Sequence, residues 1–302
     1  MNFAFSAEQE QLRESVRRFL EAKSDEAEVR RQMETARGYD ADVWAQAANQ
    51  LGLQGLGIPC EYGGSGFTAV EQGIVFEEMG RALFCGPYFA SVALAANLLL
   101  ASKDEAAMSA YLPGIAAGTT IATVALCESS GRWDEGGVSL TAVAHGSEWT
   151  LNGEKLFVLD AHVAELILVA ALTPTGVSVF AVDSAASGLT IESLPTMDQT
   201  RKQCRVQFHR TPARLVGADG AGWSATSAML DRAAVALVAE QVGGAQRVLE
   251  MAVDYAKTRV QFGRPIGSFQ AIKHKCATMR IWLQASQAAT YYAAMTLAED
   301  AP

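Results

Sequence analysis

The segment from Thr258 to Gln270 holds residue types that can bind a phosphate-bearing ligand. The guanidinium of Arg259 can form charge-assisted hydrogen bonds with phosphate, and Phe262 can pack on a flat apolar ring. Gln270 adds an amide at the expected start of a helix. A surface arginine beside a packing phenylalanine is the alternative interpretation. The residue types alone leave both interpretations open.

Two acidic residues on the stretch before this segment are candidates for a general base, the group that takes a proton from a substrate. Asp231 is followed directly by Arg232, a pattern typical of an exposed ion pair. Glu240 lies in a more apolar stretch, and a carboxyl group in such a setting is a better base than one in water. Glu240 could equally face solvent or a partner subunit.

The histidines and cysteines form no recognisable site. The four histidines are dispersed, and no spacing matches a zinc site. The five cysteines are equally scattered and include no Cys-x-x-Cys pair, which is typical of reduced thiols in a cytoplasmic protein. We therefore expect no metal site, no disulfide framework and a cytoplasmic location.

Length and composition narrow the class of protein further. The 302 residues are 50% hydrophobic and 19% charged, which suits two or three domains with apolar cores. A net charge of −9 opposes binding to the phosphate backbone of a nucleic acid. The N-terminus lacks the pattern of a signal peptide, and the most apolar stretch, Ala90 to Ala101, is too short to cross a bilayer. We expect a soluble protein that neither binds nucleic acid nor inserts into a membrane.

The hydrophobic pattern changes twice along the chain. Helical periodicity dominates the first part, in which capping boxes begin at Ser6 and Thr68. Short β-branched runs follow from Thr119, and Asn152-Gly153 between two of them indicates a hairpin. Two long helical stretches then follow a glycine-rich hinge. These patterns predict an α+β fold with an N-terminal helical domain (1–117), a middle β domain with an antiparallel sheet or barrel (118–221) and a C-terminal helical domain (222–302).

The order of these parts and four local motifs resemble the acyl-CoA dehydrogenase family, over essentially the whole chain. The four motifs are Gly-Ile-Pro-x-Glu-Tyr-Gly-Gly-x-Gly (57–66), Asn-Gly-x-Lys (152–155), the hinge Gly-x4-Gly-Trp (217–223) and Arg-x-x-Phe-Gly followed by Gln (259–270). The resemblance implies an oxidoreductase of lipid metabolism that desaturates an acyl-CoA thioester with FAD. It further implies electron transfer to an electron-transfer flavoprotein and assembly into a homo- or hetero-oligomer.

The resemblance also implies which residues contact FAD. Arg259, Phe262 and Gln270 match the segment that reaches the FAD of a neighbouring subunit. The turn and strand that face the flavin ring depart from the family pattern, in which a threonine, a small hydroxyl residue and a Trp-Ile-Thr run occupy the matching positions. Phe157 can keep the stacking role, but Leu159 cannot supply a hydroxyl bond. The expected contacts in this region come from Leu126, Cys127, Trp133, Phe157 and Leu159.

The sequence provides no catalytic base at the positions that are usual in the family. In the family it lies either in a segment beyond residue 302 or in the first helix of the last domain, where Ala233 stands here. Glu240 is two helical turns along the same face, so we take it as the candidate base. The last domain holds only two expected helices, whose apolar faces need more chain or a partner subunit.

These departures resemble the divergent actinobacterial type, which forms α2β2 enzymes for steroid or other bulky acyl groups. In such enzymes one chain supplies much of the FAD site and the other supplies the base. The alternatives are a non-catalytic or truncated structural subunit, or an acyl-CoA or nitroalkane oxidase on the same scaffold.

Overall fold

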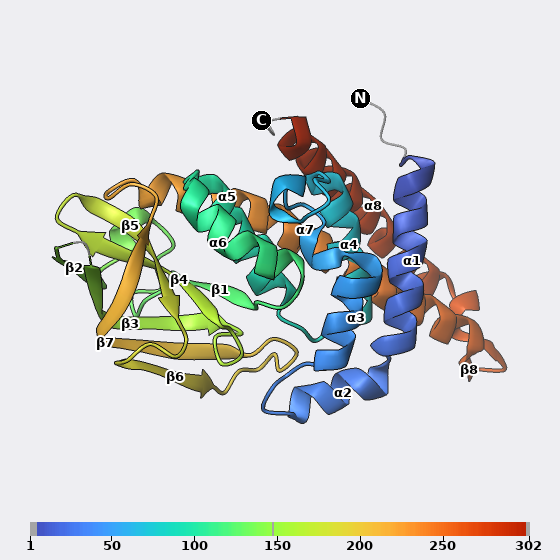
Figure 1. Ribbon diagram of the computed structural model, residues 1–302. Helices are drawn as coiled ribbons and strands as arrows, with labels where there is room; N and C mark the ends of the chain where they lie inside the picture. The colour runs from blue at the N-terminus through green and yellow to red at the C-terminus, as the bar shows by residue number, and fades with distance from the viewer. Residues whose placement is uncertain (1–4, 147, 300–302) are drawn as a thin grey trace. The chain divides into compact units, whose positions relative to one another are not determined.

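A computed structural model describes residues 5–146 and 148–299 (Figure 1). The chain divides into two compact units. The helical unit comprises the described residues of Met1–Asp25, Thr68–Phe84 and Ala234–Pro302, and the barrel unit comprises Glu26–Phe67 and Cys85–Ala233. These units join segments that are distant in sequence, so the boundaries of the three expected domains stay a prediction.

Four helices and a small hairpin build the helical unit. The helices are α1 (Ala7–Lys23), α4 (Ala69–Ala82), most of α7 (Gly222–Thr258) and α8 (Gln270–Glu299). The hairpin pairs β8 (Val260–Gln261) with β9 (Arg264–Pro265), and the short helix η5 (Ile266–Ser268) leads into α8. Both predicted capping boxes are present at the N-termini of α1 and α4. Within the described part of the chain, no helix combines the length and the apolar character needed to span a membrane.

Helices α4 and α7 touch through their backbones. A Cβ atom on Gly80 of α4 would lie 1.9 Å from the carbonyl oxygen of Glu240, and one on Gly243 of α7 would lie 1.7 Å from that of Glu77. Neither position tolerates a side chain at this separation. The two glycines therefore allow a helix crossing closer than side chains would permit.

A paired polar network crosses the interior of the helical unit. Glu77 and Glu78 of α4 are both buried. Arg13 lies 3.2 Å from Glu77, Arg17 lies 2.6 Å from Glu78, and the Tyr291 hydroxyl donates to Glu77 at 2.8 Å. Because buried carboxylates need partners, this network connects α1, α4 and α8.

The strands of the barrel unit form a closed ring. β4 pairs with β5, β5 with β7, β7 with β3, β3 with β2, and β2 with β4. β1 adds to β4 in parallel, and β6 adds to β7. The middle β domain, predicted as an antiparallel sheet or barrel, is a barrel in which parallel pairing is confined to β4 with β1 and β2. The strands are β1 (Ala122–Ala125), β2 (Thr141–His145), β3 (Glu148–Leu159), β4 (Leu166–Thr173), β5 (Gly176–Asp183), β6 (Leu189–Leu194) and β7 (Gln203–Val216).

The predicted Asn152-Gly153 hairpin turn is wrong. Both residues lie inside β3, at a register shift opposite β7. There Arg210 is an extra residue in β7, and its backbone N–H donates to the Asn152 side chain at 2.9 Å. Asn152 thus stabilises a β-bulge instead of a turn. The connection that follows β2 begins at Gly146, and residue 147 lies outside the described residues.

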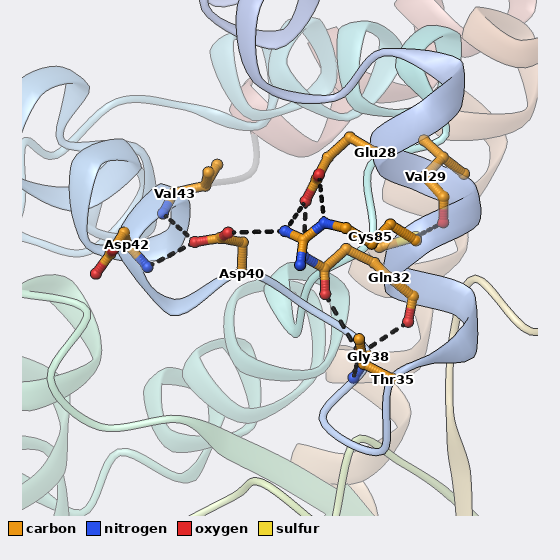
Figure 2. Close-up of polar contacts among 10 residues, drawn as sticks. Glu28, Val29, Gln32, Thr35, Gly38, Asp40, Asp42, Val43 and Cys85 are labelled. Carbon is orange, nitrogen blue, oxygen red and sulfur yellow. Dashed lines mark hydrogen bonds and ion pairs between the residues drawn. The ribbon is translucent and has the colours of Figure 1, made fainter.

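Short helices complete the barrel unit. They are α2 (Glu26–Glu34), α3 (Ala41–Leu51), η1 (Leu53–Gly55), η2 (Cys60–Tyr62), the π-helix η3 (Phe89–Ala96), α5 (Asn97–Ser102), α6 (Glu105–Ala116) and η4 (Glu135–Gly137). Figure 2 shows how polar side chains order the α2–α3 connection. Asp40 caps α3 by accepting from the backbone of Asp42 and Val43, and Arg31 pairs with Asp40 at 3.1 Å and with Glu28 at 2.6 Å.

The glycine-rich segment before α7 is anchored to the barrel and is not the flexible hinge that its composition predicts. The Asp219 carboxylate accepts hydrogen bonds from the hydroxyls of Thr173 at 2.6 Å and Ser178 at 2.9 Å. Gly222 approaches Ser178 so closely that an added Cβ would lie 2.7 Å from its backbone. Side-chain hydrogen bonds therefore fix the start of α7 on β4 and β5.

Candidate functional site

Strand β1 carries the predicted flavin turn, residues 126–134, at its C-terminal end. The Ser91 hydroxyl on η3 donates to the Ala122 carbonyl and accepts from its N–H, both at 3.1 Å. The Thr123 hydroxyl donates to the Leu159 carbonyl at 2.6 Å. β1 is thereby fixed to the π-helix at its start and to the end of β3 along its length.

The first two residues of the turn have bound carbonyls and unpaired N–H groups. The Leu126 carbonyl accepts from the Lys155 ammonium at 3.0 Å, and the Cys127 carbonyl accepts from the Leu156 N–H at 2.8 Å. Within the described part of the chain, the backbone N–H groups of Leu126 and Cys127 have no acceptor. Both residues are half-buried, and unpaired N–H groups in such positions are rare unless a ligand or water accepts from them. The edge of a flavin ring, which carries carbonyl oxygens, fits these two donors.

Phe157 projects from a bulge in β3, next to this turn. Lys155 pairs with Val206 and Val158 with Cys204, so Leu156 and Phe157 lie opposite a single residue of β7. Phe157 adopts a φ of 56°, and its side chain is 53% exposed. A strained backbone that exposes an aromatic ring is typical of a functional position. The structure therefore places Leu126, Cys127 and Phe157 together through the Leu156–Cys127 hydrogen bond.

The other two predicted flavin contacts of this region are placed differently. Trp133 is 67% exposed in the turn, beside an ion pair of 2.7 Å between Arg132 and Asp134. Leu159 is half-buried at the end of β3, where its carbonyl accepts from Thr123. The turn thus offers a broad apolar surface at Trp133, while Leu159 offers no polar side-chain group.

A buried ion pair beneath the turn was not predicted from the sequence. Glu128 and Lys155 are both buried, and the Lys155 nitrogen lies 2.6 Å from a Glu128 oxygen. Burial alone would raise the pKa of Glu128, but hydrogen bonds from Lys155 and Ser139 bring that pKa below its ordinary value. Glu128 lies in the turn after β1 and Lys155 lies on β3, so no local sequence pattern signals their pairing.

Asp160, which follows Leu159, is a second buried acid. One of its carboxylate oxygens has no hydrogen-bond partner among the described residues. Burial raises the pKa of this carboxyl to about 7, and the charge of Arg201 offsets only part of that effect. Asp160 adopts a φ of 52°, as expected for a residue that turns the chain out of a strand.

The residues predicted to reach a neighbouring subunit lie on the exposed hairpin of the helical unit. Phe262 and Gly263 form its two-residue loop with φ values of 53° and 76°, as in a type I′ turn. The Phe262 side chain is 92% exposed. Arg259 and Gln270, the first residue of α8, are also exposed, and the Arg259 guanidinium has no ion-pair partner within residues 5–146 and 148–299. This hairpin can therefore bind a group outside its own chain.

Helix α7 carries the position of the missing base. Ala233 is buried, Asp231 is exposed, and Glu240 is half-buried. The backbone of Glu240 lies against Gly80 of α4, which gives this residue a packing role in addition to any chemical one. Its role as a base stays a prediction. Among the described residues, no group of three or more His, Cys, Asp or Glu side chains could hold a metal ion.

Comparison with known proteins assigns the fold. Models of the acyl-CoA dehydrogenase N-terminal, middle and C-terminal domains match residues 6–119, 123–211 and 220–302. Acyl-CoA dehydrogenase IpdE2 of Mycobacterium tuberculosis (strain ATCC 25618 / H37Rv) is 32% identical over 281 residues, which cover 93% of this chain and 74% of the relative. The chain belongs to the acyl-CoA dehydrogenase family. The predicted family, the order of helical and β parts, and the oxidoreductase class are thereby confirmed.

Two solved structures resemble this chain over nearly its full length. A steroid acyl-CoA dehydrogenase, the Tcur3481–Tcur3483 G363A variant, is 30% identical with a TM-score of 0.86, covering 97% of this chain and 79% of that one. The ChsE4–ChsE5 complex of Mycobacterium tuberculosis is 27% identical with a TM-score of 0.90, covering 99% of this chain and 80% of that one.

Proposed function

We propose that this acyl-CoA dehydrogenase binds FAD and desaturates an acyl-CoA thioester as one subunit of an oligomer. The unpaired N–H groups of Leu126 and Cys127, beside the exposed ring of Phe157, carry this proposal. Bound FAD supplies an acceptor for the hydride that leaves the β carbon. Leu126 and Cys127 bind the edge of the flavin ring through their backbones, while Phe157 packs on its face.

A neighbouring subunit completes the flavin site in this proposal. Arg259 binds the pyrophosphate, Phe262 packs on the adenine, and Gln270 donates its amide to the same cofactor. The cost of a phenylalanine with positive φ and a solvent-exposed ring supports this role, because a partner that covers Phe262 removes the ring from water. Trp133 and Leu159 shape the remaining surface of the flavin turn.

The α proton needs an acceptor that Ala233 cannot provide. Glu240 is the candidate on this chain, two turns along the same face of α7. The alternative is a base from a second, different chain, and similarity to the two-chain ChsE4–ChsE5 complex supports it. Under either alternative, the acyl group is a steroid side chain or another bulky group, which similarity to a steroid acyl-CoA dehydrogenase supports. Electron-transfer flavoprotein as acceptor and a cytoplasmic location complete the proposal.

Flavin content and turnover test the proposal together. The chain is expressed alone and with chains encoded beside it, and the visible absorbance of each purified sample is recorded. We expect a flavin band, and reduction of an artificial electron acceptor on addition of bulky acyl-CoA. If the protein is colourless under all conditions, it binds no flavin, and the alternative of a structural subunit is favoured. Turnover that consumes oxygen and releases hydrogen peroxide would instead identify an oxidase.

A further inference from the structure

We propose that the buried Glu128–Lys155 ion pair is a positioning pair, which sets the flavin turn against the Phe157 bulge. The inference rests on the proposed flavin site and adds two residues that act on it through the backbone. Both belong to the barrel unit, Glu128 on the turn and Lys155 on β3. Neither side chain offers its charged group to a ligand, because the pair is enclosed by protein.

Each charged group of the pair has two or more hydrogen-bond partners. The Lys155 side chain is 0% exposed, and its ammonium donates to a Glu128 oxygen at 2.6 Å and to the Leu126 carbonyl at 3.0 Å. The same Glu128 oxygen accepts from the N–H groups of Ser139 and Leu140, each at 3.0 Å, and the other oxygen accepts from the Ser139 hydroxyl. A buried charge needs such partners, because unpaired charges are costly away from water.

The partners of the pair show which segments it connects. Lys155 fixes the Leu126 carbonyl, and the next residue, Leu156, fixes the Cys127 carbonyl through its N–H. Glu128 fixes Ser139 and Leu140, which lead into β2. One ion pair therefore connects the turn, the start of β2 and the segment of β3 that ends in the Phe157 bulge.

The direction of these bonds matters for the ligand. With the carbonyls of Leu126 and Cys127 turned toward β3, their N–H groups stay without acceptors in the described part of the chain. An apolar pair of equal volume could fill the same space, since buried ion pairs are often replaceable without loss of stability. Such a pair would provide no donor for Leu126 and no acceptor for Ser139 and Leu140. The ion pair thus specifies the conformation of the turn more than the stability of the barrel.

The double variant Glu128→Leu/Lys155→Met tests the positioning role, because it leaves no acceptor for Ser139 and Leu140 and no donor for Leu126. It removes both charges together, so no unpaired ion is left in the interior. Amide hydrogen exchange is measured first on the flavin-free protein, at Leu156, Ser139 and Leu140. We expect exchange at these amides to accelerate at least tenfold while the amides of β4 and β5 keep their protection. FAD titration by fluorescence should then show affinity at least tenfold weaker than that of the wild type.

Glu154→Gln is the matched control. Glu154 precedes Lys155 on the same strand and pairs with Arg205 at 3.3 Å, but both of these side chains are substantially exposed. Exposed pairs contribute little, so exchange and FAD affinity should match those of the wild type. A purely structural role for Glu128 and Lys155 predicts a lower melting temperature of the double variant with unchanged FAD affinity.

The outcomes separate this inference from the proposed function. If the wild type binds no FAD, the flavin proposal fails, while the exchange measurement still decides whether the pair orders the turn. Unchanged exchange at Leu156, Ser139 and Leu140 in the double variant overturns the positioning role. If the double variant does not fold, Lys155→Arg takes its place, because it keeps the charge but cannot repeat both contacts of the ammonium. Wild-type exchange at Leu156 in that variant would equally overturn the inference.

Discussion

Gly80 on α4 faces the backbone of Glu240 on α7 so closely that a Cβ on Gly80 would lie 1.9 Å from the Glu240 carbonyl oxygen. Gly243 and Glu77 repeat this relationship with the helices exchanged. The residue proposed as the base is therefore held at a contact between two helix backbones. Any substitution that separates the helices should also displace Glu240.

Gly80→Ala should destabilise the helical unit, because the added methyl group meets backbone atoms that cannot rotate away. Overpacking of this kind costs about 1–3 kcal/mol in free energy of unfolding. Chemical denaturation followed by circular dichroism measures it. Gly73→Ala on the same helix is the control, since its Cβ would meet nothing closer than 4.0 Å. That variant should be stabilised by roughly 0.5–1 kcal/mol. Equal effects of the two substitutions would contradict the close contact.

Glu240→Gln should lower turnover of acyl-CoA by about 10²–10⁴-fold, the usual contribution of a general base, with flavin content unchanged. The measurement uses the assembled oligomer and an artificial electron acceptor. Asp231→Asn, on the same helix but exposed, should keep wild-type turnover. If Glu240→Gln retains full turnover, the proton goes to the partner chain, and acidic residues of that chain become the next targets.

Asp160 should make the stability of the barrel unit depend on pH. The pKa of this carboxyl is raised to about 7 in the folded state, against an ordinary value of 3.8. A raised folded-state pKa means that the folded protein binds the proton more tightly, so stability falls as pH rises from about 4 to about 7. The loss from this group is at most about 4 kcal/mol, because each tenfold difference in proton affinity between the folded and unfolded states corresponds to about 1.4 kcal/mol.

Asp160→Asn removes the titration and should flatten the dependence of the free energy of unfolding on pH over that range. Arg201, Cys204, Cys85 and Tyr39 also interact electrostatically with Asp160, so each variant is compared with the wild type at every pH. Asp42→Asn, an exposed acid on α3, is the control and should keep the wild-type slope. The same slope in wild type and Asp160→Asn would rule out a neutral buried Asp160.

Phe262→Gly should change stability and flavin binding in opposite directions. Removing a side chain from a left-handed backbone position should stabilise the hairpin by about 1 kcal/mol. Loss of the exposed ring should lower FAD occupancy of the oligomer, measured by the ratio of visible to ultraviolet absorbance. Gly263→Ala is the matched change in the same loop and should destabilise the hairpin, because Gly263 has a φ of 76°. Wild-type flavin content in Phe262→Gly would remove Phe262 from the proposed site.

Local signals were sufficient to predict several elements. The capping boxes at Ser6 and Thr68 depend on residues three positions apart, so the sequence shows them directly. Helix α2 was not predicted because its nine residues contain only two large apolar side chains, Val29 and Met33, which are too few to define a periodic stripe. The Asn152-Gly153 pattern failed for another reason. The bulge partner Arg210 lies on a strand 58 residues away, so only the folded chain shows it.

The residues of the candidate site also differ in whether neighbouring residues in the sequence are enough to predict them. A loop at Phe262 could be predicted because all the relevant residues lie in one short segment, while the role of Phe262 in binding stays a prediction. The Glu128–Lys155 pair could not, because 27 residues separate its members and the acid next to Lys155 in the sequence is Glu154. The unpaired N–H groups of Leu126 and Cys127 are a property of backbone direction, which residue types do not encode.

In the π-helix η3, the number of residues matters as much as the side chains for the orientation of Ser91 toward β1. Each residue of a helix advances the chain around the helix axis, so removing one residue between Ser91 and Asn97 would rotate Ser91 away from β1. The side chain of Asn97 accommodates the wider turn by donating to the carbonyls of Val92 and Ala93. Surface loops usually tolerate insertions and deletions, but this buried helix should not. Because η3 fixes β1 and β1 leads into the flavin turn, a change in the length of η3 should also displace that turn.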